Sequence, residues 1–158
     1  MMQIPEKPKA FLFDIDGTLT DSDPVHFQIF QELITKVLTI KNPSNEPIDH
    51  DFFRKYIAGG SNPIIFKNLY PDLSEKEHEK MWTEKEKEYR KRAITSLVRL
   101  NGLSEFMEQI DAKSIPKVAV TNAPRENAEM MLKALELGIW FKDLVVLGGE
   151  CEHAKPHP

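Results

Sequence analysis

The sequence predicts an α/β fold, in which a parallel sheet of about three strands carries an inserted cap of helices. Three short apolar runs, at residues 10–13, 118–120 and 144–147, are the predicted strands. Each run is continuous and ends in a polar or glycine-rich turn, which is typical of a parallel sheet covered on both faces. Helical periodicity over residues 24–95 separates the first strand from the others, and this interruption predicts the cap.

The first predicted helix follows the first strand closely. Apolar residues recur at helical spacing from Pro24 to about Leu38. Asp23 is the expected N-cap, with proline at the first helical position. A loop rich in proline and asparagine follows at residues 41–48.

The rest of the predicted cap is a group of helices, at 50–57, 62–69 and 74–95, with a loop at 58–63. Acids and bases four residues apart alternate along the last helix, so we expect most of it to be solvated. Its thin apolar stripe consists of Trp82, Tyr89 and Ala93. The expected core of the cap is aromatic: Phe52, Phe53, Tyr56, Phe66 and Tyr70. His50 and His78 are expected to face solvent.

The second half of the chain predicts the remaining strands and the helices between them. After Asn101-Gly102, apolar residues at i, i+3, i+4 and i+7 predict a helix over 103–110. A second helix has its apolar face over 128–135 and is closed by Gly138 as a C-cap. The predicted domains are residues 1–23 with 100–158 for the sheet, and residues 24–99 for the cap.

The composition excludes several classes of protein. The chain has 158 residues, 21 basic and 25 acidic, and its net charge of −4 argues against nucleic acid as a partner. No apolar run approaches the roughly 18 residues that span a membrane, and the N-terminus does not resemble a secretory signal. A single cysteine cannot form an internal disulfide, so we expect a reducing compartment, the cytoplasm. The oligomeric state is not predicted.

Polar side chains follow each predicted strand. Because ligands bind beyond the carboxyl ends of the strands in an open α/β sheet, we expect these side chains to meet at one site. They are Asp14, Asp16, Gly17 and Thr18 after the first strand, Thr121 and Asn122 after the second, and Lys155 beyond the third. Two carboxylates, a hydroxyl and an ammonium suit phosphoryl transfer with a divalent cation.

Each group has its own part in such chemistry. Asp14 can attack phosphorus to form an acyl phosphate, and Asp16 can protonate the leaving alcohol and then deprotonate water. The attacking carboxylate meets the like charge of the phosphate, so we expect Mg²⁺ and Lys155 to neutralise it. Thr121 can donate to the phosphoryl oxygens, and Gly17 permits a tight bend near them.

Simpler interpretations of the same residues stay open. Asp16-Gly17 between two apolar stretches is also typical of a type I′ hairpin turn. Residues 121–124 alone are typical of a helix N-terminus, and Lys155 alone indicates almost nothing. The functional interpretation depends on three strand-end signals in a compatible order.

The sequence resembles the haloacid dehalogenase-like hydrolase superfamily in three motifs. Residues 14–22 (DIDGTLTDS) resemble its first motif, D-x-D-G-T-L-x-D-S, residues 118–123 its second, and residues 155–158 (KPHP) its third. The helical insert resembles the cap of the β-phosphoglucomutase and phosphoglycolate phosphatase branch. Segments around all three motifs also resemble plant sugar-phosphate phosphatases of the Sgpp type.

This resemblance implies a Rossmann-like core that hydrolyses small phosphomonoesters, such as sugar or polyol phosphates, with Mg²⁺. Asp14 would be the nucleophile and a Mg²⁺ ligand. Asp16 would be the acid and base, and would give the metal its backbone carbonyl. Thr121, helped by Asn122, would bind the phosphoryl group, and Lys155 would steady nucleophile and phosphate.

The resemblance also bears on the cap. His26 matches a histidine that helps to position Asp16 and the substrate, and an ordinary surface histidine fits the pattern equally well. Residues 58–62 match the specificity loop of the cap, but Gly60 stands where relatives often carry Lys or Arg. This favours a monophosphate phosphatase over the second alternative, a β-phosphoglucomutase-like phosphotransferase.

The family has a fourth motif, an acidic pair after a further strand, which completes the Mg²⁺ site. Residues 1–158 do not contain it, so we expect an incomplete sheet with one free edge and a weaker metal site. Two explanations are open: a truncated form of an active phosphatase, or a catalytically impaired binding or regulatory protein.

Cys151, His153 and His157 suggest a zinc site as a minor alternative. A fourth ligand is not obvious, and the segment overlaps the third motif. We expect Cys151 to be an ordinary thiol, because no base is predicted beside it.

Overall fold

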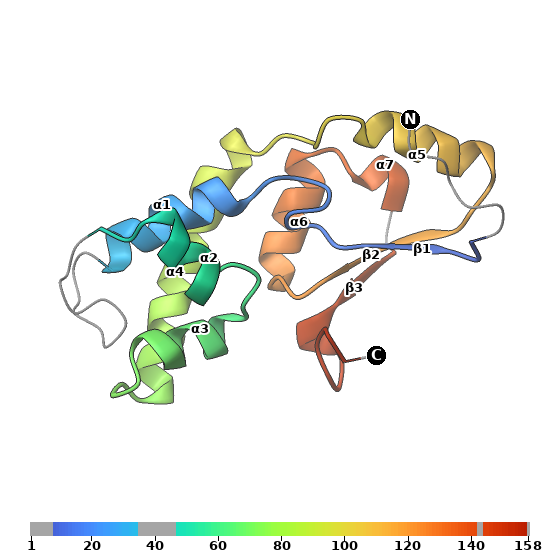
Figure 1. Cartoon of the computed structure of the whole chain (residues 1–158). Coiled ribbons are helices and arrows are strands. Elements are labelled where there is room, and N and C mark those ends of the chain that lie inside the picture. The colour runs from blue at the N-terminus through green and yellow to red at the C-terminus, as the bar shows by residue number, and fades with distance from the viewer. Residues whose placement is uncertain (1–7, 35–46, 142–143, 158) are drawn as a thin grey trace. The chain divides into compact units, whose positions relative to one another are not determined.

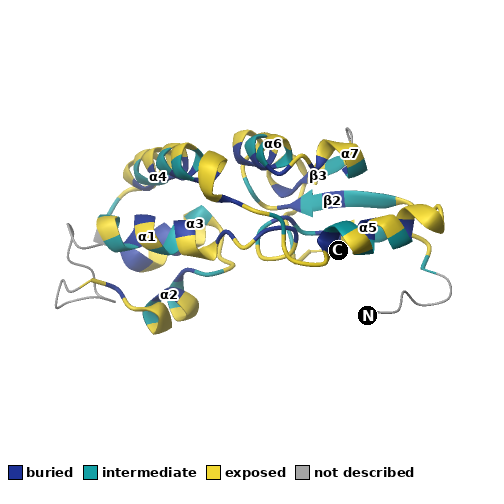
Figure 2. Ribbon diagram, turned by 90° about the horizontal axis from the view of Figure 1, so that it is seen from above, coloured by how far each residue is buried: buried dark blue, intermediate teal, exposed yellow. Residues whose placement is uncertain are grey.

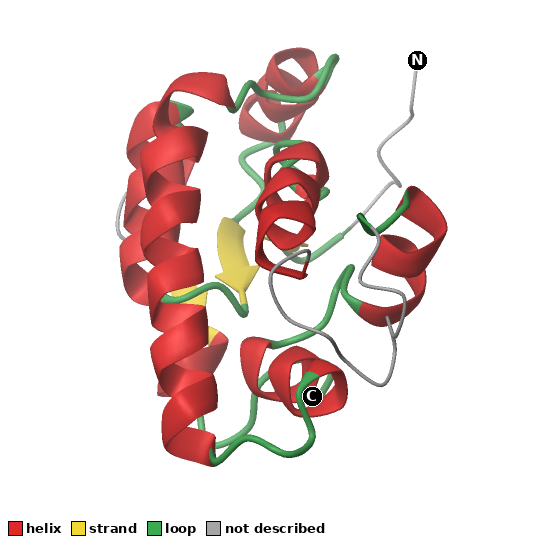
Figure 3. Ribbon diagram, turned by 90° about the vertical axis from the view of Figure 1, so that its left-hand side faces the viewer, coloured by secondary structure: helices red, strands yellow, loops and turns green. Residues whose placement is uncertain are grey.

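The computed structural model of the chain describes residues 8–34, 47–141 and 144–157. The fold is α/β, as predicted, with a three-stranded parallel sheet in the order β1-β2-β3 (Figure 1). The rest of the described chain consists of helices and loops (Figure 3). The chain divides into two compact units, Met1–Ser22 with Ile94–Pro158, and Asp23–Ala93.

The sheet belongs to the first unit. Its strands are β1 (Phe11–Phe13), β2 (Lys117–Thr121) and β3 (Val145–Leu147). Leu12 of β1 pairs with Val118, and Val120 pairs with Val146 of β3. Because all three strands run in the same direction, their carboxyl ends lie at one edge of the sheet.

Three helices connect the strands: α5 (Leu103–Ala112), α6 (Arg125–Ala134) and α7 (Gly138–Phe141). Aromatic rings fix α5 and α7 against β1. The Phe106 ring of α5 meets Phe13 edge-on at 6.2 Å between centroids, and the Phe141 ring of α7 meets it at 5.8 Å. These helices lie on one side of the strands in Figure 1.

The opposite face of the sheet is uncovered in the described chain, so the expectation that both faces are buried is wrong. Leu12 is 69% exposed, Leu144 59% and Val146 42%. Right-handed connections that run in one direction, from β1 to β2 to β3, leave all their helices on the same face. The free edge of β1 agrees with the predicted incomplete sheet.

The C-terminal end of α6 differs from the prediction. Leu135 is its C-cap, and Glu136 adopts a left-handed backbone with φ of 52°. Gly138, predicted as the C-cap, begins α7 instead. The extra turn buries Phe141, which is fully inaccessible, and this burial accounts for the additional helix.

The second unit is made of the helices α1 (Asp23–Ile34), α2 (His50–Tyr56), α3 (Asn62–Leu69) and α4 (Glu75–Ser96), of which only the end of α4 belongs to the first unit. The helix predicted over 24–38 begins at Asp23 rather than after it, and its last part lies outside the described residues. Most of the loop predicted at 41–48 also lies outside them. None of the described helices is long and apolar enough to cross a membrane.

An aromatic and aliphatic core holds this unit together, as predicted. Its buried members are Phe30, Ile48, Phe53, Ile57, Ile65, Phe66, Leu69 and Tyr70, with Phe52, Tyr56 and Trp82 packed against them. Exposed and intermediate residues occupy most of α4 in Figure 2. Tyr89 and Ala93 are its buried apolar residues, in agreement with the predicted stripe.

Two polar features of α4 depart from the sequence prediction. His78 is 5% exposed rather than solvent-facing, and its Nε2 lies 2.8 Å from the carbonyl oxygen of Tyr70. Lys85 and Glu86 are buried and form an ion pair of 2.7 Å. Periodicity cannot reveal either feature, because both depend on what packs against the helix.

The second junction between the units lies at Ile94, before the boundary expected at residues 99–100. Two hydrogen bonds explain the difference. The Thr20 hydroxyl donates to the Val98 carbonyl at 2.7 Å, and the Leu100 amide donates to the Leu19 carbonyl at 3.1 Å. These bonds tie the segment after α4 to the sheet unit.

Candidate active site

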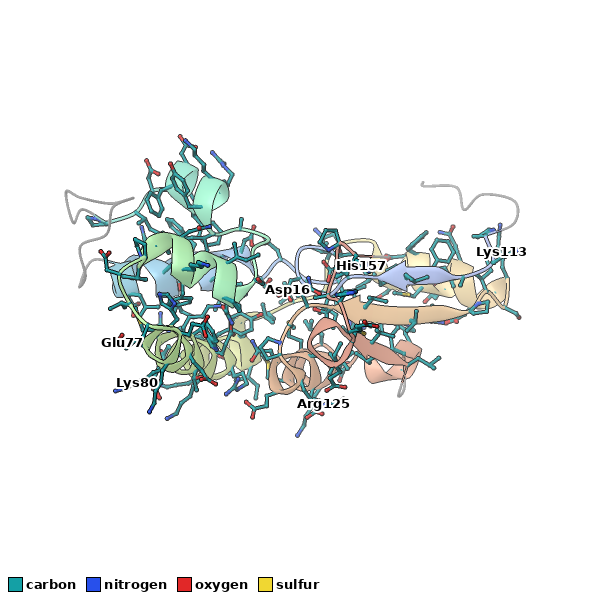
Figure 4. All side chains as sticks on the ribbon, turned by 90° about the horizontal axis from the view of Figure 1, so that it is seen from below. Asp16, Glu77, Lys80, Lys113, Arg125 and His157 are labelled. Atoms are coloured by element: carbon teal, nitrogen blue, oxygen red, sulfur yellow. The ribbon has the colours of Figure 1, made fainter. Side chains whose placement is uncertain are left out.

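The candidate site lies in the first unit, beyond the carboxyl ends of the three strands. Phe13 pairs with Ala119, and Thr121 pairs with Leu147, so the residues that follow these strands emerge at the same edge. Figure 4 shows Asp16 and His157 at this end of the sheet and Lys113 at the opposite end. This is the edge where ligands bind in open α/β sheets.

Asp14 and Lys155, 141 positions apart in sequence, meet at this edge. Lys155 Nζ lies 2.8 Å from Asp14 Oδ1 and donates to the Val120 carbonyl oxygen at 2.7 Å. The Ile15 amide also donates to Asp14 Oδ1, at 2.9 Å. The two side chains are 43% and 34% exposed, so a ligand from solvent has access to them.

The loop after Asp14 is a compact turn. The Ile15 carbonyl accepts from the amide of Leu19 at 2.9 Å, and the Gly17 amide donates to Thr20 O at 2.8 Å. Gly17 has a φ of 71°, a conformation that favours glycine. The bridge between Asp16 and Thr20 is parallel, whereas a type I′ turn would connect two antiparallel strands.

Ser22 is a site residue to which the sequence analysis gave no role. Its hydroxyl donates to Asp16 Oδ1 at 2.6 Å, and the residue is 1% exposed. This bond fixes one oxygen of the Asp16 carboxylate. The serine belongs to the DIDGTLTDS motif, so the motif itself was the signal that could have identified it.

Thr121 closes β2 and is 1% exposed. Its Oγ1 accepts from the Ala123 amide at 3.0 Å, so the oxygen is fixed and the hydroxyl hydrogen can donate. Helix α6 begins shortly afterwards at Arg125. The segment is therefore both a helix N-terminus and a strand end at the site, and the two interpretations are compatible.

Asn122 joins the second strand end to the third motif. Its Nδ2 donates to the Lys155 carbonyl oxygen at 3.0 Å, and its Oδ1 accepts from the Lys155 amide at 3.1 Å. The sequence analysis expected this side chain at the phosphoryl group. In the structure both ends of its amide contact the backbone of Lys155.

Arg125 makes a second connection between these loops, which the sequence analysis missed. Its guanidinium donates to both carboxylate oxygens of Glu150, at 2.6 and 2.5 Å, and to Glu129 at 3.3 Å. The hydrogen bond to Arg125 lowers the pKa of Glu150. No spacing rule relates residues 125 and 150, so only the fold reveals this pair.

His26 lies on α1, in the second unit. Its ring stacks on Tyr89, with centroids 4.1 Å apart and planes at 5°. Burial, together with the smaller effect of the nearby Lys85, lowers the pKa of His26 to about 3. The ring is therefore neutral at neutral pH, and the residue is partly buried.

The oxygen ligands for a divalent cation are few. Among the described residues, no group of three or more His, Cys, Asp or Glu side chains is placed to hold a metal, and this includes the zinc alternative at residues 151–157. The Asp14 carboxylate and the Asp16 backbone carbonyl are hard oxygen donors at one strand end. Such a pair fits Mg²⁺, which typically uses one or two carboxylates and takes its other ligands from water and substrate phosphate.

The fold and the strand-end carboxylate, threonine and lysine define an α/β protein of the kind that handles phosphoryl groups. The profile of the haloacid dehalogenase-like hydrolases matches residues 8–158, nearly the whole chain, and the chain belongs to this family.

Two bacterial phosphatases have sequences similar to that of this chain. A phosphorylated carbohydrates phosphatase of Thermotoga maritima is 26% identical over 151 residues, which cover 95% of this chain and 66% of that protein. An N-acetylmuramic acid 6-phosphate phosphatase of Pseudomonas putida is 24% identical, with 95% and 64% covered. The chain thus spans about two thirds of the length of these relatives.

Solved structures agree with the fold. A β-phosphoglucomutase from Clostridium difficile is 25% identical with a TM-score of 0.75, covering 96% of this chain and 67% of that one. A predicted phosphoglycolate phosphatase from Haemophilus somnus has the same TM-score at 20% identity, with 95% and 67% covered. These neighbours support the β-phosphoglucomutase and phosphoglycolate phosphatase branch.

Proposed function

We propose that the protein is a Mg²⁺-dependent phosphatase of small phosphomonoesters, with an aspartyl-phosphate formed on Asp14. The contact that supports this most directly is that between Lys155 Nζ and Asp14 Oδ1, at 2.8 Å. It places a positive charge beside the carboxylate that must approach a negatively charged phosphate. The relatives, which are phosphatases of carbohydrate and amino-sugar phosphates, support sugar or polyol phosphates as the substrate class.

In the proposed reaction Asp14 attacks phosphorus and the bond to the leaving oxygen breaks. Asp16 donates a proton to that oxygen, and the alcohol leaves. Asp16, now a carboxylate, takes a proton from water as the water attacks the aspartyl-phosphate, which releases phosphate and restores Asp14. The bond from Ser22 to Asp16 Oδ1 leaves the other carboxylate oxygen to carry the proton.

Thr121, Gly17 and Lys155 are proposed to bind the phosphoryl oxygens. Mg²⁺, when bound by the Asp14 carboxylate and the Asp16 carbonyl, would supply charge neutralisation. His26, neutral and stacked on Tyr89, is proposed to serve as a neutral hydrogen-bonding group rather than as a cation. We propose the domain roles to match: the Asp23–Ala93 unit as the cap and the other unit as the hydrolase core.

The test is release of phosphate by the purified chain from a panel of sugar phosphates, glycerol phosphates and phosphoglycolate, with and without Mg²⁺. Asp14→Asn should abolish release. Asp72→Asn, an exposed carboxylate in the second unit, is the matched control and should leave turnover unchanged. Turnover that survives Asp14→Asn, or that ignores removal of Mg²⁺, would exclude the proposed mechanism.

The same assay separates the two alternatives. A phosphotransferase of the β-phosphoglucomutase kind would transfer the phosphoryl group between sugar hydroxyls with little release of free phosphate. A binding or regulatory protein would show no Mg²⁺-dependent turnover on any ester.

We also propose the cytoplasm as the location, because the single cysteine, Cys151, is a free and exposed thiol.

A further inference from the structure

We infer that Asn122 is a positioning residue for Lys155 rather than a ligand of the phosphate. This inference rests on the proposed function of the site, because Lys155 is the residue through which it acts. The side chain of Asn122 bridges the end of β2 to the loop that carries Lys155, 33 positions further along the chain.

The geometry is that of a two-point bridge. The amide of Asn122 donates from Nδ2 to the Lys155 carbonyl and accepts at Oδ1 from the Lys155 amide, at 3.0 and 3.1 Å. Two hydrogen bonds to the same residue fix both the position and the direction of its backbone. The Oδ1 atom and one of the two Nδ2 hydrogens are therefore engaged by the Lys155 backbone.

Gly148 is the first residue of a short 3-10 helix, Gly148–Glu150, that follows β3, and it makes room for this bridge. A Cβ at residue 148 would lie 2.2 Å from Asn122 Oδ1 and 3.2 Å from the Ala154 Cβ. The backbone of residue 148 therefore borders the space that the Asn122 side chain fills. Since the oxygen is held by Lys155, a methyl group at residue 148 would displace the amide from its bridge.

The bridge matters because Lys155 lies on a loop, not on a strand. Its Nζ contacts Val120 O of β2 and the Asp14 carboxylate after β1, and its backbone is held by Asn122. Two of its three anchors therefore lie at the end of β2. A lysine side chain has four flexible carbons, and its amine is placed accurately only when its backbone is fixed. We therefore expect loss of the bridge to loosen the contact between Nζ and Asp14.

The first experiment is a double-mutant cycle in kcat/KM with Asn122→Ala, Lys155→Ala and the double variant. Asn122 is exposed, so its replacement should leave the fold intact. Loss of two exposed hydrogen bonds predicts a decrease of roughly three- to tenfold for Asn122→Ala, mostly in kcat. In the Lys155→Ala background the same change should have less than about a twofold effect.

A direct phosphate ligand would behave differently. The two losses would then multiply in the double variant, and Asn122→Ala would raise KM more than it lowers kcat. That outcome would overturn the inference. Gly148→Ala should reproduce the loss caused by Asn122→Ala, and the two changes together should be no worse than either alone. Asn68→Ala, at an exposed asparagine of α3, is the matched control.

A second readout does not need turnover. We would measure the rate at which acetic anhydride acetylates Lys155, by mass spectrometry, relative to the exposed Lys80 in the same chain. Asn122→Ala and Gly148→Ala should each raise this ratio several-fold, and Asn68→Ala should not change it. An unchanged ratio in both site variants would refute the positioning role. A wild-type chain that turns over no ester refutes the proposed function instead, and the acetylation result still decides the role of Asn122.

Discussion

The buried ion pair between Lys85 and Glu86 provides a sharp test of the forces that hold the second unit together. The two side chains are 5% and 8% exposed, and their charged atoms lie 2.7 Å apart. Asn62 donates to Glu86 Oε1 at 2.7 Å, and Lys85 Nζ lies 5.4 Å from the centre of the Phe30 ring. Both charges are therefore removed from water and depend on one another.

Removal of one partner should be severe, and removal of both should be mild. Lys85→Met or Glu86→Met leaves a single buried charge, which destabilises a protein by about 3–5 kcal/mol. The double variant leaves no unpaired charge, so we expect it to be more stable than either single variant. With a urea dependence of about 2 kcal/mol per molar, each single change should lower the unfolding midpoint by about 1.5–2.5 M.

The assay is urea unfolding followed by the fluorescence of Trp82, which packs against the core of this unit. A Trp140→Phe background removes the other tryptophan, which lies in the first unit. The exposed pair of Arg54 and Asp51 provides a control cycle, and its coupling should stay below about 1 kcal/mol. If the Lys85→Met/Glu86→Met variant loses as much stability as the two single variants combined, the pair does not act as a buried unit and the reasoning is wrong.

Three further predictions test other parts of the structure. Burial lowers the pKa of His26 from 6.5 to about 3, so the unfolded chain binds a proton that the folded chain excludes. Stability should fall as the pH drops from about 6.5 toward 3, by up to about 1.4 kcal/mol per pH unit, and the fall should be shallower in His26→Phe when urea midpoints are compared. Gly17→Ala should lower the free energy of unfolding by about 1–2 kcal/mol in thermal unfolding, because Gly17 has a φ of 71°. Gly149 has no positive φ, and a Cβ there would meet no atom within 4 Å, so Gly149→Ala should change this free energy by less than about 0.5 kcal/mol. Phe13 is 7% exposed, so Phe13→Ala should lower the free energy of unfolding by about 3–5 kcal/mol. Leu12 is 69% exposed, so Leu12→Ala should lower it by less than about 1 kcal/mol. Equal losses would show that the outer face of β1 is covered.

The fold was predictable from the sequence where pattern and packing agree. The apolar runs at 10–13, 118–120 and 144–147 coincide with the three strands, because each is a short continuous apolar run that ends in a turn. The prediction that both faces of the sheet are covered was wrong, because the face that a connecting helix covers depends on the order of the strands. The hydrophobic pattern of the sequence does not determine the order of the strands in the sheet.

The candidate site was predictable in its residues but not in all of its contacts. The meeting of Asp14 and Lys155 follows from the rule that strand ends converge, and the structure places them 2.8 Å apart. The roles proposed for them remain predictions. The pairing of Arg125 with Glu150 and the burial of His26 could not be foreseen, because both arise from loops and helices brought together by the fold.

Asn122 shows why residue type alone does not assign a role at such a site. An asparagine after a strand can donate to a phosphate or hold a neighbouring loop, and both uses draw on the same Nδ2 donor. The choice depends on whether another backbone lies within reach. Here the glycine at residue 148 admits the side chain to a position where its oxygen meets the Lys155 amide. The Asn122 bridge connects the end of β2 to the loop of Lys155. We therefore expect substitution of Asn122 or Gly148 to alter the geometry of Lys155 before it alters the stability of the fold.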